Sequence, residues 1–274
     1  VQTCALPIFL LEKQKETDHY QIQSLPINSG VFCLKKDRFQ DVVWIGTDGQ
    51  GVYLYSNPLY SIKSMVLSNY TEKIERPVRA IYLDDERTFW VGTKGNGILK
   101  IYDYEFDKNI SDCRAEVLTT SNSALSSNAV YCFAKSHRNL LWIGDEEGLT
   151  YYSYREKRIK SIPIRIGNED FKYIHDIYET ADSELWLASV GMGVVKARIA
   201  GTPDNPVIVD AQRYIINDGE LGSNYFFTIY AENEANLLFG NKGYGVFRYN
   251  ETTNGLEPVS THKYENMTLN KIGR

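Results

Sequence analysis

The sequence contains no long hydrophobic run, no basic cluster and no cysteine framework. Its longest apolar stretch, residues 5–11, ends at Glu12 and is far shorter than the roughly 20 residues that a membrane helix needs. Lys and Arg number 30 against 35 Asp and Glu, and the basic residues are scattered. We therefore expect neither membrane insertion nor a nucleic-acid partner. The four cysteines form no CxxC pair and show no metal-ligand spacing, so they indicate neither a zinc site nor a disulfide scaffold.

A repeated pattern dominates what is present. Five times a large apolar residue on a predicted strand is followed by a glycine-containing turn, as at Gly49 and Gly51. An alternating run and a polar turn precede each anchor, and a strand rich in Tyr, Val and Ile follows each glycine turn, which predicts consecutive antiparallel strands. The spacing fits the roughly 40 to 50 residues of a four-stranded blade. The anchors are Trp44, Trp90, Trp142, Trp186 and Leu238.

Helical periodicity is nearly absent, so the sequence predicts an all-β protein, a β-propeller with about five four-stranded blades. The predicted blades cover approximately residues 27–76, 77–126, 127–171, 172–222 and 223–268. We expect the anchors to fill the space between neighbouring blades, and the innermost strands to carry small residues where they crowd near the axis. The aligned small residues are Cys33, Ala80, Cys132, Asp176 and Thr228. The two cysteines are then small packing residues without a redox role.

Both ends of the chain differ from the repeats. Residues 1–10 lack the basic lead and cleavage site of a signal peptide and resemble translated adaptor sequence. We expect residues 1–18 to be a non-native or disordered lead-in and residues 19–274 to be the propeller fragment. Residues 19–25 have the character of an outer strand of a preceding blade, and residues 269–274 that of an approach to a following one. A closed five-bladed ring is the alternative.

The repeats resemble a known family. The segment LSSNAVYCFAKSHRNLLWIGDEEGL, which begins at Leu125, is similar to the two-component regulator propeller repeat, and the segments from Leu25 and Leu221 carry the same order. Departures occur in the fourth repeat, which has Ala188 in place of glycine, and in the fifth, which has Leu238 in place of tryptophan. The resemblance covers nearly the whole chain beyond about residue 19.

The resemblance implies the periplasmic sensor part of a hybrid two-component system of Bacteroidetes, an inner-membrane protein that detects carbohydrate fragments. It also implies flanking blades of an incomplete seven-bladed propeller, downstream sensor domains, a histidine kinase module in the full-length protein and possible homodimerisation. A protein-docking scaffold without a small-molecule ligand is the alternative.

The residues do not indicate catalysis or a cofactor. Two acidic clusters, residues 84–86 and 145–147, are expected as solvated turn residues on opposite ends of the disc, too far apart for the carboxylate pair of a glycosidase. The four histidines have no metal-ligand spacing, and no GxSxG motif occurs. We therefore expect no catalytic residue, no metal and no cofactor in this chain.

The predicted binding surface is the end of the disc that carries the glycine turns and the links into the following blades, here called the glycine-turn end. Its amides and charges could hydrogen-bond to sugar hydroxyls, and its tyrosines could cover the apolar face of a sugar ring. Exposed turn residues without a ligand are the alternative for each one taken alone. The candidates are Gln50, Lys94, Asn96, Asn128, Glu146, Lys172, Tyr173, Met192, Asn224, Tyr225, Lys242 and Tyr244.

Overall fold

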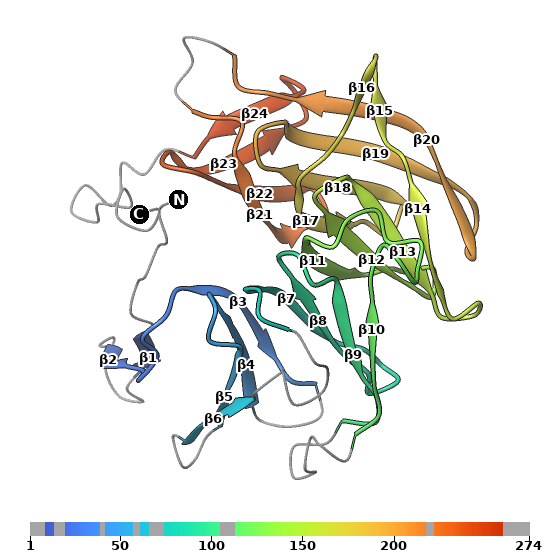
Figure 1. The fold of residues 1–274 in the computed structure, drawn as a ribbon. Helices are drawn as coiled ribbons and strands as arrows, with labels where there is room; N and C mark the ends of the chain where they lie inside the picture. The colour runs from blue at the N-terminus through green and yellow to red at the C-terminus, as the bar shows by residue number, and fades with distance from the viewer. Residues whose placement is uncertain are drawn as a thin grey trace.

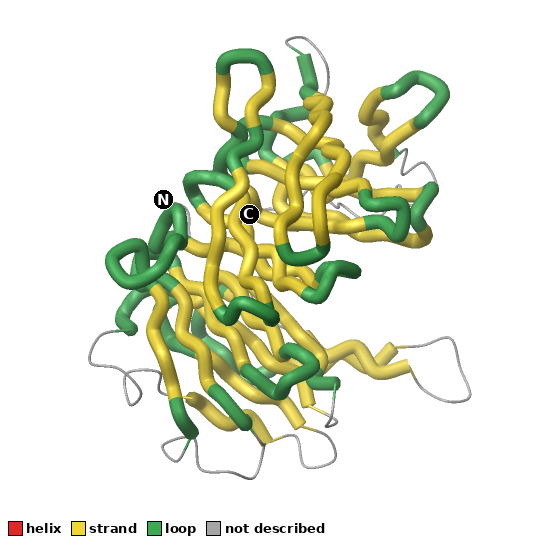
Figure 2. Tube along the Cα trace, turned by 90° about the vertical axis from the view of Figure 1, so that its right-hand side faces the viewer, coloured by secondary structure: helices red, strands yellow, loops and turns green. Residues whose placement is uncertain are grey.

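The structure is a computed structural model that describes residues 9–13, 20–38, 42–56, 61–65, 74–104, 113–217 and 222–259. Within these ranges the chain forms strands and loops without a helix, as Figure 2 shows. No helical segment with the length and apolar character needed to cross a bilayer occurs in the described ranges. Five of its sheets have four strands each, which confirms the predicted all-β propeller of five four-stranded blades. His19, His262, Cys4 and residues 269–274 lie outside the described residues.

The blades follow one another along the chain, with neighbouring strands antiparallel. Blade 1 consists of β3 (Val31–Lys36), β4 (Val42–Thr47), β5 (Val52–Ser56) and β6 (Ser61–Met65). Blade 2 consists of β7 (Val78–Leu83), β8 (Phe89–Thr93), β9 (Ile98–Ile101) and β10 (Ala115–Leu118). Blade 3 consists of β11 (Val130–Lys135), β12 (Leu140–Asp145), β13 (Leu149–Ser153) and β14 (Arg158–Ile162).

Blade 4 consists of β17 (Ile174–Glu179), β18 (Glu184–Ser189), β19 (Gly193–Thr202) and β20 (Asn205–Tyr214). Blade 5 consists of β21 (Phe226–Asn233), β22 (Asn236–Asn241), β23 (Gly245–Asn250) and β24 (Gly255–Pro258). The first strands of consecutive blades lie beside one another, from β3 through β7, β11 and β17 to β21. The blades therefore form an arc with these strands innermost (Figure 1). Among the described residues, the first strands of the last and first blades, β21 and β3, do not pack against each other as the first strands of consecutive blades do.

Two short hairpins lie outside the blades. β1 (Phe9–Lys13) pairs with β2 (Tyr20–Ser24), and β15 (Arg165–Ile166) pairs with β16 (Glu169–Asp170) in the link between blades 3 and 4. Residues 9–13, which belong to the predicted lead-in, are thus the partner strand of residues 20–24. The blade boundaries and the origin of residues 1–18 stay predictions.

The tryptophan anchors fill the spaces between blades, as expected from the repeat. Their side chains are at most 2% exposed. The ring centroid of Trp44 lies 4.3 Å from that of Phe89 in blade 2, and the centroid of Trp90 lies 4.8 Å from that of Tyr152 in blade 3. Leu238, the anchor of the last blade, is only half-buried, because no further blade covers that face in the described residues.

The first strands carry small residues where neighbouring strands and blades lie close together, as the sequence predicted. Cys132 pairs with Gly144 in the neighbouring strand, where the next blade approaches closely. A Cβ atom added to Gly144 would lie 2.6 Å from the carbonyl oxygen of Ile174 in blade 4 and 2.5 Å from the Cys132 sulfur. A larger residue at either position would push the blades apart. Burial raises the pKa of the Cys33 thiol to about 12, in keeping with a packing role.

Candidate ligand-binding site

Backbone hydrogen bonds bring the glycine turns and the interblade links to the same end of the disc. Within a blade, the Lys94 N–H donates to the Pro77 carbonyl at 2.9 Å. Between blades 2 and 3, the N–H groups of Gly95 and Gly97 both donate to the Asn128 carbonyl at 2.9 Å. Positive φ angles of 122° and 75° let these two glycines turn both donors toward one acceptor. The link into the next blade is therefore fastened to the preceding glycine turn.

The same fastening recurs between blades 4 and 5. There the N–H groups of Gly191 and Gly193 donate to the Asn224 carbonyl at 2.8 and 3.1 Å. The Asn224 side chain accepts the Ile216 N–H at 2.7 Å, and the Asn128 side chain accepts the Thr120 N–H at 2.9 Å. The asparagine of the repeat's Ser-Asn pair thus joins blades, which explains why it accompanies the glycine turn in the sequence.

Several predicted contact residues already have partners inside the protein. The Asn96 side-chain oxygen accepts the Arg76 N–H at 2.9 Å. The Met192 sulfur accepts the Lys172 N–H at 3.3 Å, and the Lys172 ammonium forms an ion pair with Glu147 at 2.5 Å. Asn96, Asn128, Asn224, Met192 and Lys172 therefore have structural roles at this end. The Glu146 carboxylate accepts a long hydrogen bond, 3.4 Å, from the Ser127 hydroxyl.

The remaining candidates present their side chains to solvent at the glycine-turn end. Tyr173, Tyr225 and Tyr244 are 41%, 43% and 46% exposed, which is unusual for such large rings. The Lys242 ammonium lies 5.6 Å from the centroid of the Tyr225 ring. Gln50 and Lys94 are also exposed, and Gln50 accepts a hydrogen bond from the Tyr53 hydroxyl at 2.9 Å. Rings and hydrogen-bonding groups thus occur together on this surface.

The structure adds a set of residues that the sequence analysis missed. In every blade the first strand is irregular at its second residue, where the pairing with the second strand shifts register. A β-bulge of this kind re-aims the side chain of the extra residue. We call the five residues at this position the bulge arc: Phe32, Arg79, Tyr131, His175 and Phe227. In the sequence they could have been found as the large residue that always precedes the small one.

Members of the bulge arc contact one another from blade to blade. The Arg79 guanidinium lies 3.6 Å from the centroid of the Phe32 ring. The rings of Tyr131 and His175 stack with centroids 4.3 Å apart, and the Phe227 ring meets His175 edge-on at 5.2 Å. Each member lies near the glycine-turn end, because its strand begins opposite the last residue of the second strand, as Val31 does opposite Thr47.

Burial and neighbouring charges keep two rings of the bulge arc neutral. Burial, together with the nearby charges of Arg79 and Lys94, lowers the pKa of His175 to about 4, so the imidazole is neutral at physiological pH. Burial raises the pKa of Tyr131 to about 12, an effect that Glu146 reinforces and Arg79 opposes. Two neutral hydrogen-bonding rings therefore lie beside a guanidinium.

The acidic clusters are less solvated than expected. Asp84 is 1% exposed and accepts the Trp90 indole N–H at 2.9 Å and the Thr88 N–H at 2.7 Å. Asp145 is fully buried, accepts hydrogen bonds from Ser126 at 2.6 Å and from the Gly148 N–H at 3.0 Å, and has its pKa raised to about 6 by burial. The expectation that these two are solvated turn residues was wrong, because each satisfies donors of its own turn or anchor.

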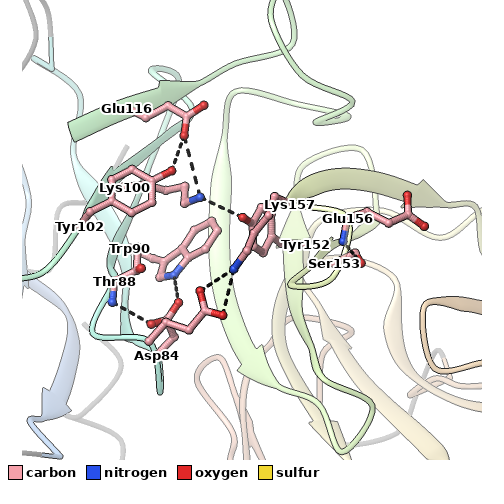
Figure 3. A network of polar contacts seen from close by, with 11 residues as sticks. Asp84, Thr88, Trp90, Lys100, Tyr102, Glu116, Tyr152, Ser153, Glu156 and Lys157 are labelled. Atoms are coloured by element: carbon pink, nitrogen blue, oxygen red, sulfur yellow. Dashed lines mark hydrogen bonds and ion pairs between the residues drawn. The ribbon is translucent and has the colours of Figure 1, made fainter. Parts of the chain in front are cut away.

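A groove of about 520 Å³ lies at the outer side of blades 2 and 3, and it is lined by Lys100, Tyr152 and several further cations. The Lys100 ammonium is surrounded by the rings of Trp90, Tyr102 and Tyr152, at 4.5, 4.7 and 4.3 Å from their centroids. It donates to the Tyr152 hydroxyl at 3.2 Å, and burial lowers its pKa to about 8. Figure 3 shows that this lysine links the two blades.

The other cations of the groove are paired within the protein. Lys157 forms an ion pair with Glu86 of blade 2 at 2.6 Å, and Lys160 forms one with Glu156 at 2.6 Å. Arg158 also contacts Glu156. The groove therefore lies between blades 2 and 3, and each of its cations already has a carboxylate partner in the protein.

Known structures share this architecture. The extracellular domain of a hybrid two-component system from B. thetaiotaomicron matches 88% of this chain with a TM-score of 0.63 and 21% identity, and the match covers 30% of that structure. Virginiamycin B lyase from Staphylococcus aureus matches 88% of this chain and 75% of its own, with a TM-score of 0.63 and 15% identity. The chain is a β-propeller. These likenesses concern the fold, and the first agrees with the family resemblance of the repeats.

A secretion-system component and a translation factor are also similar to parts of this chain. PorZ, a surface component of the type-IX secretion system of Porphyromonas gingivalis, matches 81% of the propeller with a TM-score of 0.59 and 15% identity, over 32% of its length. Translation initiation factor 6 of Saccharolobus solfataricus is 31% identical over 140 residues, which are 46% of this chain and 57% of that protein. The propeller thus spans little more than half of this curated relative. No family model matches the sequence.

Proposed function

We propose that this propeller is the extracytoplasmic sensor part of a two-component signalling protein and that it binds a carbohydrate fragment without transforming it. The observation that carries the proposal is the exposure of Tyr173, Tyr225 and Tyr244 beside lysine and amide groups at the glycine-turn end. Sugar-binding surfaces combine aromatic faces for the C–H side of the ring with hydrogen-bonding groups for its hydroxyls.

The fold likeness to an extracellular domain of a hybrid two-component system supports the sensor part of the proposal. Location outside the cytoplasm and connection to a membrane-anchored kinase are part of the same proposal. Flanking blades, downstream sensor domains and homodimerisation remain expectations from the family resemblance.

Calorimetric titration of the chain with a panel of oligosaccharides tests the proposal. For the best binder, we expect Tyr173→Ala and Tyr244→Ala each to weaken binding about tenfold, since stacking a ring on a sugar contributes on the order of 1 kcal/mol or more. Matched controls are His137→Ala and Asp182→Ala, which change exposed residues in the turns between first and second strands, at the other end of the disc. Their affinities should stay within about twofold of the unmodified chain.

Two outcomes would contradict the proposal. Binding that survives both tyrosine substitutions but is lost in the two controls would place the ligand at the opposite end. A complete lack of binding across neutral and acidic oligosaccharides would favour the protein-docking alternative. The exposed face of blade 5, with Tyr230 and Val246 62% and 37% exposed, is the surface at which to look for such a partner.

A further inference from the structure

The β-bulge at the second residue of the first strand recurs in every blade, so it is a feature of the repeat. The register shift occurs at the same place in all five blades, between Val31 and Cys33 in the first and between Phe226 and Thr228 in the last. Residues at the third position are small where the next blade approaches, as at Ala80 and Cys132, and Thr228 of the last blade is exposed. Those at the second position are large, although a bulge there requires no large side chain. The bulge therefore places five large side chains on the innermost strands, where they contact one another from blade to blade.

These side chains form a partly open surface with one cation in it. Phe32 and Phe227, at the two ends of the bulge arc, are 36% and 43% exposed, whereas Arg79, Tyr131 and His175 are half-buried. The central carbon of the Arg79 guanidinium lies 3.6 Å from the centroid of the Phe32 ring, a cation–π contact. Aromatic rings continue the surface on the other side, through Tyr131 and His175.

Arg79 has unused hydrogen-bonding capacity. Its Nε atom is buried and has no acceptor in the described part of the chain. Asp48 is the acidic side chain whose charge acts on Arg79, and the two form no ion pair among the described residues. An arginine Nε–H and one terminal N–H together form the fork that binds a carboxylate or a sulfate through two parallel hydrogen bonds. A buried donor without an acceptor is costly, and a ligand oxygen would remove that cost.

Two cations act on the His175 ring of the arc. Arg79 and the exposed Lys94 both act on His175, and their positive charges oppose protonation of its ring. The acidic groups whose charges act on members of the arc are Glu146 and Asp145, on Tyr131, and Asp48, on Arg79. Tyr131 and His175 are both neutral at physiological pH, so each can donate a hydrogen bond to a ligand oxygen without adding a charge.

We propose that the bulge arc binds the acidic group of a charged oligosaccharide, a uronate carboxylate or a sulfate ester, with Arg79 holding the anion and the aromatic members covering the adjacent sugar rings. This inference rests on the proposed function and specifies its ligand class. The exposed tyrosines at the glycine-turn end then contact the outer part of the same oligosaccharide.

The test compares acidic and neutral ligands on one matched pair of variants. Arg79→Met removes the guanidinium from the arc, and Arg76→Met removes one from an exposed position at the same end of the disc. Calorimetry is performed with trigalacturonate, with a sulfated chondroitin disaccharide and with neutral galactotriose. We expect at least one acidic ligand to bind more tightly than galactotriose and Arg79→Met to weaken it tenfold or more. Arg76→Met should change the affinity for this acidic ligand less than threefold. It should also make the salt dependence of binding shallower.

A second readout separates loss of the site from loss of folding. An anion held beside His175 raises the pKa of this histidine, which nuclear magnetic resonance can follow because the chain has 4 histidines. We expect inorganic sulfate at about 50 mM to raise the His175 pKa relative to chloride in the unmodified chain and in Arg76→Met. Arg79→Lys, which keeps the charge but loses the fork, should show a smaller rise and a weaker acidic-sugar affinity.

The failures of the two proposals can be told apart. Binding of galactotriose that equals or exceeds that of both acidic ligands leaves the proposed function standing and overturns the inference. Absence of all sugar binding overturns the proposed function, and the acidic-sugar inference with it. An unchanged His175 pKa in sulfate, or equal effects of Arg79→Met and Arg76→Met on acidic-ligand affinity, refutes Arg79 as the residue that holds the anion.

Discussion

Removal of the Trp90 side chain should be among the most destabilising single changes in the chain. The indole is fully buried, packs on Tyr152 and Phe133 of blade 3, and donates its N–H to Asp84 at 2.9 Å. Trp90→Ala leaves a cavity between blades 2 and 3, at a cost of about 3 to 5 kcal/mol. It also leaves one oxygen of the buried Asp84 without its donor, which adds about 1 kcal/mol or more.

The matched control is Leu238→Ala, at the same repeat position in blade 5. Leu238 is half-buried and has no following blade against it in the described residues, so we expect a loss of about 1 kcal/mol. Urea unfolding followed by far-ultraviolet circular dichroism measures both, because this signal does not depend on the tryptophans. Equal losses for the two variants, or a loss below about 2 kcal/mol for Trp90→Ala, would refute the assignment of the anchors as interblade packing.

Three further outcomes follow from the described geometry. Burial in the folded protein lowers the Lys100 pKa to about 8, so the unfolded chain binds more protons than the folded one between about pH 8 and 10.5. In urea melts, the free energy of unfolding of the unmodified chain, compared with Lys100→Met, should therefore rise over this range by on the order of 2 to 3 kcal/mol. Gly97→Ala should lower the thermal midpoint more than Gly49→Ala. Both glycines have a positive φ, but only at Gly97 would the added Cβ meet backbone, 2.2 Å from the Leu118 carbonyl oxygen. Iodoacetamide at pH 8 should leave Cys33 and Cys132 unmodified in the native protein, because burial raises both thiol pKa values, and rapid labelling would contradict their packing role.

The repeat made most of the fold predictable. Trp44 and Gly51 belong to local patterns that recur in each blade, so strand, turn and anchor could be aligned without any knowledge of long-range contacts. The positive φ of the turn glycines and the burial of the tryptophans then follow from the four-stranded blade. The interblade role of Asn128 also has a sequence signal, although its carbonyl rather than its side chain fastens the glycine turn.

The candidate site was only partly predictable. A strict alternation of inward and outward residues cannot show a β-bulge, which changes the direction of one side chain, so Arg79 and His175 were overlooked. Burial of Asp84 depends on an indole donor from the following strand, and burial of Asp145 on a serine hydroxyl from the preceding link. Neither partner can be identified from an acidic residue in a turn. Asn96 and Met192 stay predicted ligand contacts, and the sequence did not show that each also has a partner inside the protein.

The placement of the ligand at the glycine-turn end is tested most directly by hydrogen–deuterium exchange with and without a saturating oligosaccharide that the chain binds. We expect exchange to slow in peptides that contain Tyr173 and residues 242–245, where the backbone lies beneath the exposed rings. Peptides that contain residues 84–88 and 136–139, in the turns at the opposite end, should exchange at unchanged rates. Slower exchange confined to those opposite turns, with none at residues 173 and 242–245, would contradict the placement.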